Sequence, residues 1–200
     1  MSKVVFIVLI FLCNICTGSH VAHNVVSLCH PESVCAEVGV WKGEFTREIV
    51  QRQPKELYLI DPWAFQKTEF PNRWFSGKIA KSQEDMDKIH ASIAETFGVM
   101  PNVHILRNKS VDAFKMIKDD TFDWVYIDGN HEEEPTLQDL RDSYRTTKKG
   151  GYITGDDYSW QNDTGSHCVK MAVARFVHEY HLPPPEIHHQ GGWQFVIQKP

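Results

Sequence analysis

The sequence predicts a doubly wound α/β sandwich, in which about seven strands form a mostly parallel sheet with an antiparallel C-terminal edge strand. Three observations predict this fold. Short apolar runs alternate along the chain with segments of helical periodicity. Two of these runs, within 122–131 and 148–158, each end in carboxylates and are separated by one helix-length crossover, as in a β-α-β unit. Residues 186–189 and 193–198 then read as a closing hairpin around Gly191-Gly192.

The first strand and helix are read from residues 22–51. A short helical lead-in is expected over Ala22–Leu28. Ser33–Val40 is a near-continuous run of strand formers, which suits a central parallel strand covered on both faces. Gly39 and Gly43 bracket a tight turn, and a helix opens at Phe45. Such a turn lets backbone N–H groups and a helix N-terminus approach a ligand closely.

Leu57–Ile60 is predicted as the second strand, and Asp61 ends it. A carboxylate about twenty residues after a glycine turn is well placed to accept hydrogen bonds from both hydroxyls of a ribose. This strand, turn, helix, strand and acid pattern is typical of sites for nucleoside-bearing cofactors. By itself this pattern is weak evidence for such a site, because the spacing of Gly39 and Gly43 is not the Gly-x-Gly-x-x-Gly of dinucleotide enzymes.

The middle of the chain begins with a long aromatic loop, Pro62–Ala80, which reads either as a lid over a substrate or as a loop packed on the core. Ser82–Phe97 has the periodicity of an amphipathic helix, with Ser82 and Asp85 as a candidate capping box. Val103–Leu106 is expected as a third strand. Apolar residues at helical spacing from 111 to 117 then predict another helix.

The second half of the chain starts with the unit from Phe122 to Trp160, which supplies the fourth and fifth strands. Pro135 suits the first turn of the helix between them, and Gly150 is expected to end that helix. Residues 169–180 form the last strongly periodic segment, and prolines at 183–185 stop it.

Carboxylates cluster at the expected ends of the fourth and fifth strands. Asp128 would end one strand, and Asp156 and Asp157 the next. Neighbouring strands lie about 4.8 Å apart, so these side chains can share one cation. Hard oxygen ligands favour Mg²⁺, Mn²⁺ or Ca²⁺ over zinc. The alternative, that these are ordinary solvated loop residues, stays open at this point.

Composition bounds the class of protein. The chain has 200 residues, 42% hydrophobic and 24% charged, which suits one globular domain with a full-sized core. Its net charge is -5, and no basic run is present. Nucleic acid and anionic membrane surfaces are therefore not expected as partners, because binding phosphate groups requires clustered Lys and Arg.

The first residues resemble a secretory signal peptide. Lys3, the apolar run Val4–Cys13 and the small residues up to Ser19 match its three parts, so residues 1–19 are predicted as a signal peptide and 20–200 as the single domain. The apolar run is too short for a stable membrane span. This predicts a secretory or extracellular location. The alternative is a buried N-terminal strand or helix of a cytoplasmic protein.

The cysteines and the N-glycosylation sequons bear on whether the protein is secreted. Cleavage near Ser19 would leave Cys29, Cys35 and Cys168, and an odd count leaves at least one free thiol. Cys35 falls in a predicted central strand, where it is interpreted as a small buried apolar residue. The sequons at Asn108 and Asn162 are compatible with secretion, although such motifs arise easily by chance.

Four stretches together resemble one family over Ser33–Lys199. They are Glu-Val-Gly-Val-Trp-Lys-Gly at 37–43, Ile-Asp-Pro-Trp at 60–63, Tyr-Ile-Asp-Gly-Asn-His at 126–131 and Gly-Gly-Tyr-Ile-Thr-Gly-Asp-Asp at 150–157. The pattern is similar to that of class I S-adenosylmethionine-dependent methyltransferases, specifically the small metal-dependent O-methyltransferases of the macrolide-sugar and catechol types. The resemblance implies a Rossmann-like sheet with strand order 3-2-1-4-5-7-6.

The resemblance also implies roles for single residues. Gly39 and Gly43 would line the methionine end of S-adenosylmethionine, with Glu37 supporting the turn. Asp61 would bind the ribose and Ser110 would lie near the adenine. The resemblance places Mg²⁺ (or Mn²⁺) on Asp128, Asp156 and Asp157. It places the general base at His131, three residues after Asp128.

These residues suit methyl transfer to oxygen. A sulfonium methyl is already electrophilic, so the enzyme must align a hydroxyl with it and remove the proton. Metal coordination lowers the pKa of a hydroxyl, and a histidine accepts a proton at neutral pH. The expected substrate is a small hydroxylated molecule, a sugar diol or a catechol. Relatives of this type usually carry more chain before the first strand, so whether the protein is a homo-oligomer stays open.

Two other functions compete with this one. A secreted binding protein could keep the fold without catalysis, but it would be free to lose the acidic, glycine and histidine positions. A nucleotide-dependent oxidoreductase is disfavoured by the Gly39 to Gly43 spacing, and it has no use for three carboxylates at the fourth and fifth strands.

Overall fold

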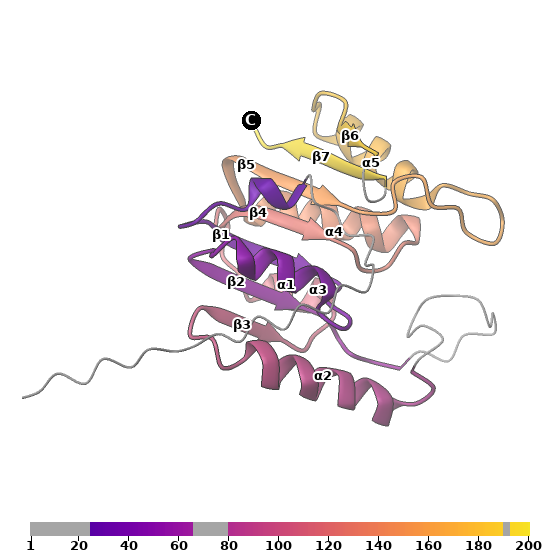
Figure 1. Ribbon diagram of the computed structural model, residues 1–200. Helices are drawn as coiled ribbons and strands as arrows, with labels where there is room; N and C mark the ends of the chain where they lie inside the picture. The colour runs from indigo at the N-terminus through magenta and orange to yellow at the C-terminus, as the bar shows by residue number, and fades with distance from the viewer. Residues whose placement is uncertain (1–24, 66–79, 190–192) are drawn as a thin grey trace, which may run out of the picture.

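The computed structural model describes residues 25–65, 80–189 and 193–200 (Figure 1). Its strands are β1 (Val34–Val38), β2 (Glu56–Ile60), β3 (Val103–Leu106), β4 (Phe122–Ile127), β5 (Thr147–Gly155), β6 (Glu186–His188) and β7 (Gln194–Gln198). Its helices are the 3₁₀ turn η1 (Val25–Leu28) and the α-helices α1 (Glu44–Gln51), α2 (Gln83–Phe97), α3 (Ser110–Lys115), α4 (Glu133–Thr146) and α5 (Cys168–Glu179).

The strands form one seven-stranded sheet in the order β3-β2-β1-β4-β5-β7-β6. Strands β1 to β5 pair in parallel, whereas β7 pairs antiparallel with both β5 and β6. The predicted fold class and the strand order are confirmed. Because the order reverses between β1 and β4, the carboxyl ends of these two strands flank the crevice where doubly wound sheets bind ligands.

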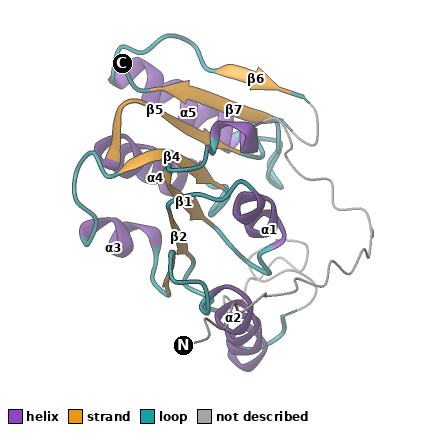
Figure 2. Ribbon diagram, turned by 60° about the vertical axis from the view of Figure 1, so that its left-hand side comes forward, coloured by secondary structure: helices purple, strands orange, loops and turns teal. Residues whose placement is uncertain are grey.

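Helices cover both faces of the sheet (Figure 2). On one face, η1, α1 and α2 pack side chains such as Val26, Ile49 and Phe97 against Cys35 and other strand residues. On the opposite face, α3, α4 and α5 pack against the alternate strand positions, Ala36 and Val38 among them. Successive strand residues point to opposite faces, so a central strand must be apolar throughout, and this is why the runs in the sequence are continuous.

The predicted element boundaries hold within a few residues, and the helix start at Ser82 is confirmed in detail. Its hydroxyl accepts the Asp85 amide at 3.2 Å, which satisfies one of the free donors of the first turn of α2. In a capping box, the side chain of the third helical residue also accepts a backbone amide near the N-cap. Here the Asp85 carboxylate accepts the amide of Lys81, the residue before Ser82, at 2.9 Å.

The prediction that Gly150 ends the helix before the fifth strand is wrong. Helix α4 ends at Thr146, and β5 begins at Thr147, which pairs with Phe122. Gly150 lies within the strand at φ +80°, in an irregular stretch where the register with β4 shifts. Its amide bonds to the carbonyl of Lys199 at 2.8 Å, so the glycine bends β5 while keeping it hydrogen-bonded to the C-terminal segment.

The predicted signal peptide (1–19), most of the aromatic loop (66–79) and the Gly191-Gly192 turn lie outside the described residues. Among the residues that the structure describes, none of the helices combines the length and the apolar character needed to cross a membrane.

Candidate active site

A cavity of about 970 Å³ opens at the carboxyl ends of the parallel strands. Each parallel strand from β1 to β5 sends a residue or its following loop into the cavity wall. It contains seven of the nine residues singled out from the sequence, namely Gly39, Asp61, Ser110, Asp128, His131, Asp156 and Asp157. The fold therefore brings together side chains that are far apart along the chain.

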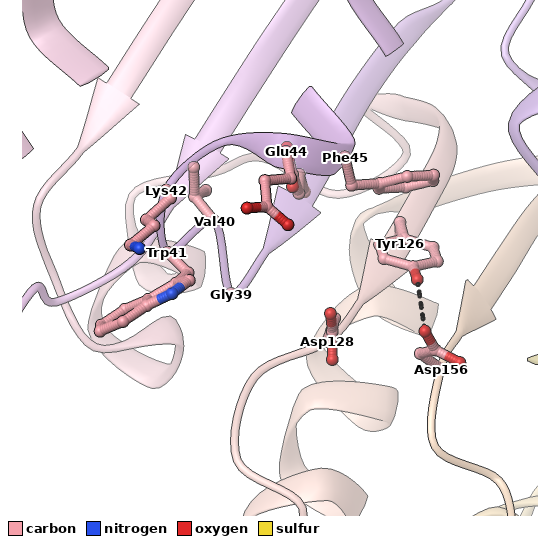
Figure 3. A pocket seen from close by; sticks show the side chains of 10 residues that line it. Gly39, Val40, Trp41, Lys42, Glu44, Phe45, Tyr126, Asp128 and Asp156 are labelled. Carbon is pink, nitrogen blue, oxygen red and sulfur yellow. Dashed lines mark hydrogen bonds between the residues drawn. The ribbon is translucent and has the colours of Figure 1, made fainter. Parts of the chain in front are cut away.

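A second cavity of about 180 Å³ adjoins the first on the side of α1 (Figure 3). It is lined by the strand-end residues Glu37, Tyr126, Asp128 and Asp156, by Gly39, Val40, Trp41 and Lys42 of the turn, and by Glu44 and Phe45 at the start of α1. Gly39, Trp41, Asp128 and Asp156 line both cavities, so the two spaces meet between the glycine turn and the ends of β4 and β5.

Gly39 is a glycine because nothing larger fits there. Its φ is +88°, and a Cβ at this position would lie 1.9 Å from the carbonyl oxygen of Asp128. The carboxyl end of β1 thus packs directly on the loop that follows β4. Only a residue without a side chain permits both the left-handed conformation and this approach of the two backbones.

Gly43 has a different local role. It is the N-cap of α1 with φ +70°, and a Cβ there would lie 2.7 Å from the Phe97 ring and 2.8 Å from Ile93. Gly43 therefore allows α1 to begin close against α2. It is absent from the walls of both cavities in the described part of the chain.

Asp61 fixes the glycine turn from the end of β2. One carboxylate oxygen accepts the amides of Val40 and Trp41, both at 3.0 Å, and the other accepts the Trp63 amide at 2.6 Å. Burial raises the pKa of this carboxyl, and the three amide donors oppose that effect. A carboxylate offers about four acceptor positions, so one remains for a ligand in the large cavity.

Glu37 lies below the turn in β1 and is 1% exposed. Its carboxyl accepts a hydrogen bond from the Thr46 hydroxyl on α1 at 2.6 Å. Burial raises the pKa of Glu37 well above its usual range, and the negative charges of Asp128 and Asp61 raise it further. Glu37 therefore ties α1 to β1 and forms part of the wall of the small cavity.

His131 lies between two carboxylates at the mouth of the large cavity. Its Nε2 atom is 3.2 Å from Oδ1 of Asp128 and 3.2 Å from Oδ2 of Asp157. One ligand atom from each of the three residues lies within 4.8 Å of the others, which is close enough to hold one metal ion. Burial disfavours the charged imidazole, but the hydrogen bond to Asp128 and the charge of Asp157 outweigh it and raise the pKa of His131.

Asp156 faces the small cavity and is held by its neighbours. One oxygen accepts the Asp157 amide at 2.9 Å, and the other accepts the Tyr126 hydroxyl at 3.3 Å (Figure 3). Burial and the nearby charge of Asp128 raise the pKa of Asp156 to about 7. The three aspartates predicted to hold the metal are thus neighbours, but the cluster with the shortest distances contains His131 in place of Asp156.

Four residues of the site were not singled out from the sequence. Tyr126 lies inside a quoted motif, but only the structure shows that its hydroxyl contacts Asp156. Gln194 on β7 is fully buried and donates to that hydroxyl at 3.3 Å, and no local pattern marks it. The Trp160 ring stands 5.6 Å from the His131 ring in an edge-on arrangement, and Asp139 accepts a hydrogen bond from Ser110.

The fold and the site define a class of protein: a Rossmann-like α/β protein with a large cavity at the switch point of a doubly wound sheet, where such folds bind ligands. More particularly, residues 36–158 match a family described as a methyltransferase domain. This match spans more than half of the chain, and the protein therefore belongs to the methyltransferase-domain family. The prediction of a methyltransferase is confirmed.

Solved structures of similar fold include the O-methyltransferase NovP, with a TM-score of 0.62 and 19% identity over 88% of this chain and 78% of NovP. A putative S-adenosyl-L-methionine-dependent methyltransferase from Methanococcus maripaludis has a TM-score of 0.62 and 14% identity, over 90% of this chain and 84% of that one. At these identities the similarity is one of fold.

A curated relative in sequence is the uncharacterized protein R132 of Acanthamoeba polyphaga mimivirus, 27% identical over 169 residues. The aligned region covers 79% of this chain and 66% of the viral protein. The chain thus spans slightly less than two thirds of the length of this relative.

Proposed function

We propose that the protein is an S-adenosylmethionine-dependent, Mg²⁺-assisted O-methyltransferase that acts on a small hydroxylated substrate, such as a sugar diol or a catechol. The observation that carries this proposal is the position of the Asp128, His131 and Asp157 cluster. It lies in the wall of the same cavity that contains the Gly39 turn and Asp61. A cation site and a nucleoside site therefore share one space.

The cofactor fits the two adjoining cavities. Asp61 has acceptor capacity left for a ribose hydroxyl at the end of β2, and Ser110 after β3 lines the same wall, where the adenine would lie. The methionine end would enter the small cavity beside Gly39, where the carboxyls of Glu37 and Asp156 are suited to an ammonium group. The membership in the methyltransferase-domain family supports this assignment.

The residues present also fit a divalent cation. Asp128, Asp156 and Asp157 offer carboxylate oxygens at neighbouring strand ends, and burial together with the charge of Asp128 raises the pKa values of Asp156 and Asp157. Oxygen ligands of this kind favour Mg²⁺ or Mn²⁺. A bound Mg²⁺ would lower the pKa of a coordinated hydroxyl and orient it toward the methyl group.

His131 is suited to accept the proton of the acceptor hydroxyl. It lies at the wall of the cavity, and Asp128 and Asp157 orient its Nε2 atom. A cation bound by these carboxylates would replace the imidazolium as their counter-charge and so leave the imidazole neutral and able to act as a base. The Trp160 ring packs beside it and gives the substrate an apolar wall.

The test is a calorimetric titration of the full chain with S-adenosylhomocysteine, with and without Mg²⁺, because it requires no knowledge of the substrate. Micromolar binding supports the proposal. Absence of binding by folded protein would overturn it. Methyl transfer from labelled S-adenosylmethionine to a panel of sugar diols and catechols, compared with amine and thiol acceptors, then tests the preference for oxygen.

A further inference from the structure

Asp139 is a buried carboxyl that the proposed chemistry does not use. It lies on α4, far from the strand ends in sequence, and is only 3% exposed. Nevertheless it forms part of the wall of the large cavity, on the same side as Ser110 and Gln138. A carboxyl in such a position needs hydrogen-bond donors, because burial without them is costly.

The donors that the protein supplies to Asp139 are few. The Ser110 hydroxyl donates to it, and among the described residues no second donor accompanies Ser110. Burial raises the pKa of Asp139 to about 7, against the effect of Ser110, and the charge of Asp142 raises it further. Gly129 has no side chain, and a Cβ there would lie 3.6 Å from Oδ2 of Asp139, so the glycine leaves the carboxyl uncovered toward the cavity.

The position of this carboxyl suggests its ligand group. Asp61 lies after β2, Ser110 lies after the neighbouring strand β3, and both line the large cavity with Asp139, so a nucleoside whose ribose binds Asp61 could reach Ser110 and Asp139 with its base. Adenine carries an exocyclic 6-amino group, which is an N–H donor. On the basis of the proposed function, we propose that Asp139 accepts a hydrogen bond from this amino group and so selects an adenine-bearing cofactor.

The test is a thermodynamic cycle in which the Asp139 carboxyl of the protein and the 6-amino group of the ligand are removed separately and together. Calorimetry at pH 8 compares S-adenosylhomocysteine with its analogue whose purine lacks that group. Wild-type protein should bind S-adenosylhomocysteine about tenfold or more tighter than the analogue, as expected for a hydrogen bond to a charged group. In Asp139→Ala the ratio should fall to about threefold or less. Asp112→Ala, an exposed acid on α3, should keep the wild-type ratio.

The outcomes are distinguishable. Equal binding of the two ligands by wild-type protein overturns the role of Asp139 even if the variant fails to fold. A variant that weakens both ligands by the same factor identifies Asp139 as a structural partner of Ser110 and also overturns it. Failure of wild-type protein to bind S-adenosylhomocysteine would overturn the proposed function itself.

A second, independent observation concerns Cys29 and Cys35. The sequence alone gives Cys35 the role of a buried apolar residue, but the structure places its Sγ atom 3.4 Å from that of Cys29. Cys29 follows η1, Cys35 lies in β1, and both are 0% exposed. The hydrogen bond from Cys35 lowers the pKa of Cys29, against the effect of burial, and Arg52 lowers it further.

We infer that these two thiols are a site of disulfide formation by exchange with a small disulfide such as oxidised glutathione. The Cys29 thiolate attacks one sulfur and releases a first glutathione thiolate. Cys35, losing its proton, then attacks the sulfur of Cys29 and releases the second. Two protein thiols are oxidised and one glutathione disulfide is reduced. The bond would fasten the N-terminal turn to the central strand.

The full chain is refolded from urea in buffers of graded glutathione potential. In the unfolded chain both thiols are accessible to glutathione, so their burial in the native state does not slow the exchange. Free thiols are then alkylated and the peptides mapped by mass spectrometry. The expected product links Cys29 to Cys35 with a loss of two hydrogens and leaves Cys168 alkylated. Cys168→Ser should not change the link. If Cys29 and Cys35 stay alkylated or form only glutathione adducts at oxidising potentials, the inference is wrong.

Discussion

The Nε2 atom of His131 lies 3.2 Å from Oδ2 of Asp157, although the two residues belong to loops after different strands. The same nitrogen lies 3.2 Å from Oδ1 of Asp128. A protonated imidazole at this position would offset one of the two carboxylate charges. The proposed Mg²⁺ would bind the same carboxylates and so exchange with the imidazolium as their counter-charge, and this exchange can be tested.

His131→Gln should destabilise the metal-free protein by about 1 kcal/mol, because a partly buried charge pair is lost. Adding Mn²⁺ should then raise the unfolding midpoint more in the variant than in wild-type protein, since no imidazolium competes with the ion. Thermal unfolding with and without metal measures both effects. His188→Gln, which removes the partner of Glu186 at the C-terminal edge of the sheet, is the matched control and should leave the metal response as it is. Equal responses in all three proteins would contradict the exchange.

Asp128→Asn should weaken Mn²⁺ binding by about tenfold or more, because it replaces a charged ligand oxygen with an amide. The affinity for S-adenosylhomocysteine should change by about threefold or less, since the proposed cofactor contacts rest on Gly39, Asp61 and Ser110 and the amide keeps the size of the side chain. Titration calorimetry with each ligand separates the two effects. An unchanged metal affinity would remove Asp128 from the metal site.

Gly39→Ala should destabilise the protein by at least about 2 kcal/mol, because the added Cβ meets the Asp128 carbonyl and φ is positive. Gly150→Ala is a matched control, since its φ is also positive but nothing lies within 4 Å of the added Cβ. It should cost about 1 kcal/mol. Urea unfolding of the two variants isolates the cost of the close approach, and equal losses would show that the contact does not matter.

Tyr126→Phe should weaken Mn²⁺ binding severalfold. The variant keeps the buried ring but removes the hydroxyl that donates to Asp156 and accepts from Gln194. Tyr152→Phe removes a hydroxyl that accepts from Gln198 on the same sheet, away from the cluster, and should leave metal binding unchanged. A similar loss in both variants would indicate a general effect on the sheet.

The burial of Asp139 predicts that the free energy of unfolding depends on pH. Its folded pKa of about 7 lies above the usual value for Asp, so the native state binds the proton more tightly than the unfolded chain. Its contribution to the free energy of unfolding therefore falls as pH rises from about 4 to 7. Asp139→Asn should flatten this part of the profile in urea unfolding experiments from pH 4 to 8. A variant with the wild-type slope would show that Asp139 titrates normally.

The fold class follows from the amino-acid sequence alone, and so does the position of most of the residues in the cavity wall. Parallel strands buried on both faces must be continuous apolar runs, so Val34–Val38 and Phe122–Ile127 are recognisable without neighbours. The residue at which a strand ends can also be recognised from the local sequence. This is why Asp61, Asp128 and Asp156 could be assigned to the ligand-binding edge of the sheet. Gly150 was misread because a glycine after a helix is usually its cap, and only the pairing with Lys199 makes it part of a strand.

Which of these residues are in contact depends on the packing of the elements. No periodicity in the sequence places Gln194 against Tyr126, Asp139 against Ser110 or Cys29 against Cys35, because each pair joins different elements. The packing also placed Gly43 at the contact between α1 and α2, and it placed His131 between Asp128 and Asp157. Local sequence specifies elements and their ends, whereas distances between side chains depend on how the helices pack across the sheet.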